Sequence, residues 1–162
     1  MTIRRAILSD IPQMQEVFAI ARQFMIMTGN PNQWVNGYPC DEFLCRDIES
    51  GNSYVCLEDD KIVATFLLCG GEDPTYAKIK DGAWLNNEPY TTIHRIASNG
   101  KVHGVLRAAM ELALQQYDNI RIDTHRDNYV MQHAVEKEGF RYFGIIYCWS
   151  GDERLAYQYI KE

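Results

Sequence analysis

The chain has 162 residues, of which 46% are hydrophobic, and its 16 Lys and Arg against 22 Asp and Glu give a net charge of −6. This length supports one sizeable core, so we expect a single domain over residues 1–162. A net negative charge disfavours nucleic acid as a partner and weakly favours a cationic one, such as an amine. No apolar run could span a membrane and no targeting signal is visible, so we expect a soluble, cytoplasmic protein with no membrane partner.

Strands and helices alternate along the chain, with no linker or repeat between them, which predicts one α/β domain. The predicted strands cover residues 2–6, 53–57, 62–68, 90–98, 119–124, 143–149 and 154–160. Four helices are predicted. The first follows Ser9-Asp10, the second covers residues 41–51, and the third runs from Gly104 to about Tyr117. The fourth extends from a cap at Asp127 or Asn128 to a stop at Gly139. A polar tetrad, residues 58–61, predicts a hairpin between the second and third strands.

Residues 98–110, SNGKVHGVLRAAM, join a predicted strand to a predicted helix. The first amides of a helix lack intrahelical partners, and the helix dipole favours negative charge there. Gly104 would let a pyrophosphate approach the backbone closely, and Lys101 and His103 could add hydrogen-bond donors. The alternative is an ordinary strand-to-helix turn, because one glycine is a weaker signal than a glycine-rich motif.

The sequence after this stretch resembles a known family. It is similar to the second half of the GCN5-related N-acetyltransferase (GNAT) fold, whose members use acetyl-CoA. The similarity lies in a strand, the residues THRDN (124–128), then Met131 and Ala134, and finally EKEGF (136–140). In that family an Asn opens the helix after the fifth strand, and a Gly-Phe pair closes it. The order of elements is similar over most of the chain.

The same family carries an Arg/Gln-x-x-Gly-x-Gly/Ala motif at the start of its central helix, which falls on residues 101–106 here. Gly104 is kept, whereas Lys101 and Leu106 depart from the motif. The resemblance implies a mixed, mostly antiparallel sheet with helices on both faces. Its parallel strands, 90–98 and 119–124, would splay apart at their C-terminal ends and leave a slot for the pantetheine arm.

The resemblance also implies acetyl-CoA as co-substrate and assigns residues to it. The main chain of Ile96 and Ser98 would pair with the pantetheine arm as an added strand, and the pyrophosphate would rest on the amides of residues 102–106. Asn128 and Met131 would lie near the acetyl end or the pantetheine, although a helix cap and a core position are the alternatives. The implied cofactor-binding residues are Ile96, Ser98, Lys101, Val102, His103, Gly104, Val105, Leu106, Asn128, Met131 and Lys137.

The reaction implied by the family is transfer of an acetyl group from a thioester to a primary amine by direct attack in a ternary complex. His94 is a candidate base because histidine changes protonation near neutral pH. Side chains alternate between the two faces of a strand, so the side chain of His94 is predicted to share a face with that of Ile96. Many family members supply the acid as a tyrosine seven residues after the helix-opening Asn, but Val135 stands at that position. Tyr142 and Tyr147 are candidate substitutes, with packing as the alternative.

Two turn-rich segments, residues 28–39 and 72–90, are rich in aromatic side chains, whereas ordinary turns favour small polar residues. They could form the wall of a pocket for a small-molecule or peptide amine, with anchoring of the loops as the alternative. The candidate substrate-binding residues are Trp34, Tyr38, Trp84 and Tyr90. The last two strands could complete this site or form a homodimer interface.

The spacing of the histidines predicts no metal site, and the five cysteines lack CxxC spacing, so we expect reduced, mostly buried thiols. Two other classes of protein stay open. The departures at Leu106 and Val135 would also suit a catalytically silent acyl-CoA binder. A doubly wound nucleotide-binding module is less favoured, because it requires a glycine-rich first turn and residues 4–12 contain no glycine.

Overall fold

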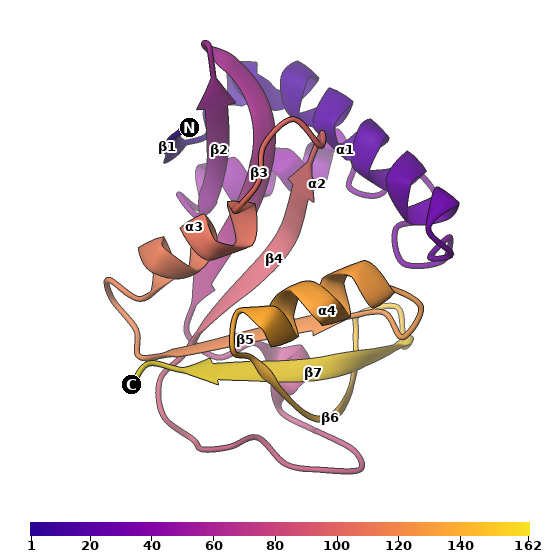
Figure 1. The fold of residues 1–162 in the computed structure, drawn as a ribbon, viewed down its shortest axis with the longest axis vertical. Helices are drawn as coiled ribbons and strands as arrows, with labels where there is room; N and C mark the ends of the chain where they lie inside the picture. The colour runs from indigo at the N-terminus through magenta and orange to yellow at the C-terminus, as the bar shows by residue number, and fades with distance from the viewer.

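A mixed sheet of seven strands, in the order β1-β2-β3-β4-β5-β7-β6, organises the computed structural model, which describes residues 1–162 (Figure 1). The strands are β1 (Thr2–Arg5), β2 (Ser53–Glu58), β3 (Lys61–Gly70), β4 (Thr91–Ser98), β5 (Asn119–Thr124), β6 (Arg141–Tyr147) and β7 (Glu153–Ile160). The helices are α1 (Ile11–Met27), α2 (Asp41–Glu49), α3 (Val105–Ala113) and α4 (Tyr129–Lys137), with short 3-10 helices η1 (Leu8–Asp10) and η2 (Pro74–Tyr76). No helix is both long and apolar enough to cross a bilayer.

Helices cover both faces of this sheet, as predicted. Figure 1 shows α3 and α4 in front of the strands and α2 behind them. The α3–α4 side holds an apolar cluster of 14 buried residues, which includes Ala109 and Val135. The opposite face carries two smaller clusters, one built on α1 and α2 and one built on Tyr76 and Tyr90 from the segment between β3 and β4. The sheet therefore separates two layers of packed side chains.

The only parallel pair, β4 with β5, separates soon after it begins. Its register is limited to Thr91 opposite Ile120 and Thr92 opposite Arg121, and Figure 1 shows the two strands diverging from there. All other neighbouring strands are antiparallel. The predicted splayed parallel pair is confirmed, and it leaves one edge of β4 without a strand partner beyond Thr92.

A β-bulge interrupts β4 directly after His94. Thr65 pairs with Ala97 and Leu67 with His94, so β4 has one more residue than β3 in this interval, and Arg95 adopts a left-handed φ of 47°. Consequently Ile96 packs on the α3–α4 side, whereas His94 bonds to Asp73 on the other side. The prediction that His94 and Ile96 share a face is wrong, because a bulge breaks the alternation of side chains along a strand.

Two further expectations differ from the structure. Helix α3 ends at Ala113 and not near Tyr117, because the amides of Gln115 and Gln116 bond to the carbonyls of Leu112 and Ala113 in the tighter i→i−3 pattern. The thiols are free but not mostly buried: Cys56 is buried, Cys40 is exposed at the start of α2, and the other three are half-buried.

Arg121 of β5 fixes the long segment between β3 and β4 to the sheet. This arginine is only 5% exposed, and its guanidinium carbon lies 4.1 Å from the ring centre of Trp84 and 4.0 Å from that of Tyr90. Its Nη2 donates to the carbonyl of Asn86 at 2.8 Å. Burial lowers the pKa of this guanidinium from its ordinary value, and the two aromatic faces stabilise the buried cation.

Replacing Arg121 with alanine is expected to lower the free energy of unfolding by about 2–4 kcal/mol, because the change removes two cation–π contacts and leaves a cavity. Urea denaturation would measure the loss. Arg141→Ala is a suitable control, since Arg141 also lies over one ring, that of Phe143 at 5.7 Å, but is exposed. Equal stability of the two variants would show that Arg121 does not hold this segment.

Candidate active site

The turn between β4 and α3 presents a row of free backbone amides. The amides of Gly100 and Lys101 are already bonded to the side chains of Ser98 at 3.1 Å and Asn99 at 3.0 Å. The amides of residues 102–107 donate to no group of the protein, and no side chain caps α3. We call residues 102–107 the amide row. Such a row at a helix N-terminus is suited to binding a phosphate or another anion.

The side chains around the amide row leave it open. Gly104 adopts a left-handed φ of 81°, and a Cβ placed there would meet no atom within 4 Å. The side chain of Val105 is buried, and Val102 and Leu106 pack against the α3–α4 cluster, so these side chains turn away from the space in front of the amides. Leu106, which departs from the family motif, therefore leaves its amide accessible. The row fits a pyrophosphate group.

The other cofactor candidates lie on β4, on α4 and in the turn before α3. The main chain of Ile96 and Ser98 belongs to the part of β4 that has no partner on its β5 side, which is the geometry needed to pair with an extended ligand. Met131 packs against the α3–α4 cluster, as a core position would. His103 is exposed beside the amide row, and Lys137 is exposed in the last turn of α4.

Asn128 caps helix α4 and also holds the loop between α1 and α2. Its Oδ1 accepts from the amide of Met131 at 3.0 Å, which confirms the predicted cap. Its Nδ2 donates to Oε1 of Gln33 at 2.9 Å, and the residue is 7% exposed. No local pattern predicts this link to Gln33, because the partners lie 95 residues apart.

Asn128→Ala is expected to destabilise the protein by about 1–3 kcal/mol, because it removes a helix cap and one of the donors to Oε1 of Gln33, which also accepts from Asn30 at 2.9 Å. Asn128→Ser keeps a capping oxygen and removes the donor to Gln33, so we expect a smaller loss. Urea unfolding of both variants would measure the two contributions. If the alanine variant were as stable as the wild type, the cap would have no energetic role.

On the opposite face of the sheet, His94 and Asp73 form a hydrogen-bonded pair. The distance between Nε2 of His94 and Oδ2 of Asp73 is 2.9 Å. The other carboxylate oxygen of Asp73 accepts from the amide and the hydroxyl of Thr75, at 2.9 and 2.7 Å. Burial raises the pKa of the Asp73 carboxyl, but the hydrogen bonds from His94 and Thr75 outweigh burial and hold this pKa below its usual value. An ionised Asp73 therefore orients the imidazole.

Sequence reasoning missed Asp73, which lies 21 residues before His94 in a long turn-rich segment. A local signal was present, because Asp73 followed by Pro74 and Thr75 is a typical start of a helical turn. The structure confirms that start, since η2 begins at Pro74 and Asp73 accepts from the amide of Thr75. The pairing with His94 depends on long-range packing, which this signal does not contain.

The four aromatic residues predicted to bind substrate all make contacts within the protein. Trp84 Nε1 donates to the carbonyl of Tyr76 at 2.8 Å, and the hydroxyl of Tyr90 accepts from the amide of Asp73 at 2.8 Å. These contacts support the anchoring alternative for Trp84 and Tyr90. Trp34 and Tyr38 are half-buried beside α1 and the β4 bulge, where the hydroxyl of Tyr38 accepts from Arg95 at 2.6 Å.

The tyrosines proposed as acids lie on the edge strand β6. Tyr147 is 41% exposed at the end of this strand and makes no hydrogen bond with His94 or Asp73. Tyr142 is exposed and packs edge-on against Tyr157, with ring centres 5.8 Å apart. Val135, at the family's usual position for the acid, is fully buried in the α3–α4 cluster. No group of three or more His, Cys, Asp and Glu side chains is arranged to bind a metal ion.

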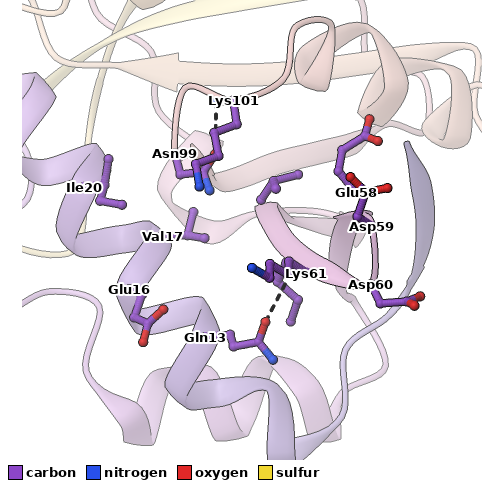
Figure 2. Close-up of a pocket in the computed structure, with 12 residues that line it drawn as sticks. Gln13, Glu16, Val17, Ile20, Glu58, Asp59, Asp60, Lys61, Asn99 and Lys101 are labelled. Atoms are coloured by element: carbon purple, nitrogen blue, oxygen red, sulfur yellow. Dashed lines mark hydrogen bonds between the residues drawn. The ribbon is translucent and has the colours of Figure 1, made fainter.

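A groove of about 950 Å³ lies between α1, the β2–β3 hairpin and the turn after β4 (Figure 2). Of the residues predicted to bind a ligand, it contains Lys101 alone. Its other charged side chains are Glu16, Glu58, Asp59, Asp60 and Lys61. This excess of carboxylates would repel a phosphate. We therefore assign the candidate anion site to the amide row, and Lys101 lies at the boundary between the two.

Comparison with known proteins identifies the family to which this fold belongs. A scan against protein-family models finds no match, and a search of curated proteins finds none either. Among solved structures, an acetyltransferase of the GNAT family from Streptococcus agalactiae is 34% identical with a TM-score of 0.85, and the match covers 99% of this chain and 95% of that one. The fold is thus that of an acetyltransferase. The chain belongs to the GNAT family.

More distant structures show the same fold. A putative acetyltransferase from Staphylococcus aureus is 22% identical with a TM-score of 0.72, and the match covers 99% of both chains. A ribosomal-protein-alanine N-acetyltransferase from Brucella melitensis is 15% identical with a TM-score of 0.63, and the match again covers 99% of both chains. At these identities the comparison defines the architecture and not the substrate.

Proposed function

We propose that this protein transfers an acetyl group from acetyl-CoA to a primary amine by direct attack in a ternary complex. The amide row is the observation that carries the proposal, because it offers free donors beside the edge of β4 that has no strand partner. Membership of the GNAT family supports acetyl-CoA as the co-substrate. The acceptor is a small-molecule or peptide amine.

Residues of β4 and of the turn that follows it would hold the cofactor. The amides of residues 102–107 would bind the pyrophosphate, and the main chain of Ile96 and Ser98 would pair with the pantetheine arm. Acetyl-CoA, when bound, supplies an acetyl thioester. The β4–β5 opening would then connect this cofactor side of the sheet with the side on which His94 lies.

His94 and Asp73 would prepare the acceptor. An ammonium group must lose a proton before it can attack, and a base within hydrogen-bond reach or one water of it can take that proton. His94, oriented by Asp73 at 2.9 Å, is the base that we propose. Val135 cannot donate a proton to the leaving group, because its side chain is aliphatic and buried.

An assay of coenzyme A release tests the proposal. Purified protein is mixed with acetyl-CoA and a panel of primary amines, and free thiol is followed over time. We expect release that depends on both the amine and the enzyme. If no amine stimulates release above the rate of thioester hydrolysis in buffer, the proposed transfer is wrong.

The second candidate is a silent acyl-CoA binder, and the buried Val135 favours it because the family's usual acid is missing. Such a protein would bind acetyl-CoA through the same amide row but would release no thiol with any amine. Binding without turnover would therefore support this candidate, whereas amine-dependent release would exclude it.

A further inference from the structure

Two titratable side chains lie on the same face of the sheet just beyond the point where the parallel strands separate. The last β4–β5 pair is Thr92 opposite Arg121, and His94 and Asp123 lie two residues further along their strands. A step of two residues keeps a side chain on the same face of a strand. Both residues are also tied to one short segment, since His94 bonds to Asp73 and Asp123 bonds to Tyr76. His94 and Asp123 therefore border the same opening on the α1–α2 side of the sheet.

Tyr76 holds the Asp123 carboxylate in a fixed orientation. Its hydroxyl donates to Oδ2 of Asp123 at 2.6 Å, and its ring centre lies 6.2 Å from that of His94. Burial, followed by the charge of Asp123, raises the pKa of Tyr76 well above its ordinary value, so the phenol stays protonated and remains a donor. Oδ1 of Asp123 accepts no hydrogen bond from the protein, and the residue is half-buried.

The charges around the opening suit a cation. Asp73 and Asp123 both border it, while the nearby cation Arg95 is neutralised by two bonds of 2.7 Å to Asp47. Two other arginines lie on this side: Arg121 is buried between two rings, and Arg154 is 7% exposed and donates to the carbonyls of Glu153 and Gln33. Oδ1 of Asp123 accepts no hydrogen bond from the protein and is therefore available to an ammonium group.

Aromatic side chains follow the same side of β4 from the bulge onward. The guanidinium of Arg95 lies 5.7 Å from the ring centre of Tyr38 and 6.0 Å from that of Phe43. Tyr38 in turn lies 6.2 Å from Trp34, measured between ring centres. These rings offer an apolar surface, next to the residue that follows His94, for the body of an acceptor.

We infer that Asp123 binds the ammonium group of the acceptor, and that the acceptor is a primary amine with an apolar or aromatic body. The catalytic consequence rests on the proposed acetyl transfer. One N–H bond would point at Asp123 Oδ1 while a proton of the ammonium passes to His94. The nitrogen then forms a bond to the thioester carbonyl carbon and the carbon–sulfur bond breaks. A second proton passes from the nitrogen to the sulfur, so that coenzyme A leaves as the thiol.

Binding of tyramine tests this inference without acetyl-CoA. Tyramine has an aromatic body and no carboxylate, and tyrosol replaces its ammonium group with a hydroxyl. We expect ligand-observed NMR titrations to show that wild-type protein binds tyramine and that Asp123→Asn weakens this binding about tenfold to a hundredfold, as loss of a charged hydrogen bond should. Tyrosol should bind weakly to both proteins.

Matched variants separate the role of Asp123 from effects of charge and folding. Asp118→Asn removes the same charge from an exposed position just before β5 and should leave tyramine binding unchanged. Asp123→Glu keeps the carboxylate and should retain most of the affinity, which also shows that the position tolerates substitution. The affinity for acetyl-CoA should be the same in all three variants as in the wild type.

Equal binding of tyramine by the wild type and by Asp123→Asn would overturn the inference, and so would failure of the wild type to bind tyramine. Tyramine binding that depends on Asp123, in a protein that releases no coenzyme A, would leave the inference standing and refute the proposed transfer. Thiol release with tyramine that is unaffected by Asp123→Asn would support the transfer and contradict the inference.

Discussion

Replacing Gly104 with glutamate is expected to lower the affinity for acetyl-CoA by about a hundredfold or more, while the protein remains folded. The new side chain would start at a φ of 81° and enter the open space in front of the amide row. It would place a negative charge where we propose that the pyrophosphate binds, in the region where the helix dipole favours anions. The strain of a left-handed residue adds only about 1–2 kcal/mol. Isothermal titration calorimetry would measure the affinity.

Gly51→Glu is the matched control for this variant. Gly51 follows α2 and has a φ of 79°, and a Cβ placed there would also meet no atom within 4 Å. The two substitutions therefore share the added charge and the backbone strain, but only one lies at the amide row. We expect Gly51→Glu to bind acetyl-CoA as the wild type does. Wild-type affinity in Gly104→Glu would place the cofactor elsewhere on the molecule.

Replacing His94 with glutamine is expected to lower kcat by about 10²- to 10⁴-fold, which is the usual range for loss of a general base. The KM for acetyl-CoA should change little, because His94 lies on the face of the sheet opposite the α3–α4 side. Asp73→Asn should also lower kcat, since an amide cannot orient the imidazole as the ionised carboxylate does. Steady-state rates of thiol release, measured with an active amine, would give both parameters.

His133→Gln is the control for the histidine variant, because His133 is exposed on α4. It should keep the wild-type kcat. The role of His94 as a base would be contradicted if His94→Gln kept wild-type kcat across the pH range in which histidine titrates. A loss of kcat in His94→Gln that Asp73→Asn did not share would remove only the orienting role of Asp73.

Local signals in the sequence predicted the elements on which the site is built. The apolar spacing after Ser9-Asp10 predicted α1, the Asn128 cap predicted the start of α4, and Gly104 predicted the start of α3. Each of these depends on residues within one or two helical turns. The splayed parallel pair followed from resemblance to the family, since the separation of two strands leaves no mark on the sequence of either.

The acceptor side of the site could not be predicted in the same way. The bulge at Arg95 is a property of the register between β3 and β4, so the sequence of β4 alone predicted regular alternation and the wrong face for His94. Asp73 reaches His94, and Tyr76 reaches Asp123, across 21 and 47 residues of chain. Such contacts result from the packing of the segment that Arg121 fixes to the sheet, and no local pattern contains them.

Calorimetric titration of the wild-type protein with acetyl-CoA, alongside free coenzyme A and ATP, tests the central claim most directly. The account predicts micromolar binding of acetyl-CoA and of coenzyme A, with much weaker binding of ATP, because the amide row and the open edge of β4 together select a pyrophosphate joined to a pantetheine arm. Absence of acetyl-CoA binding, or binding of ATP as tight as that of acetyl-CoA, would contradict it.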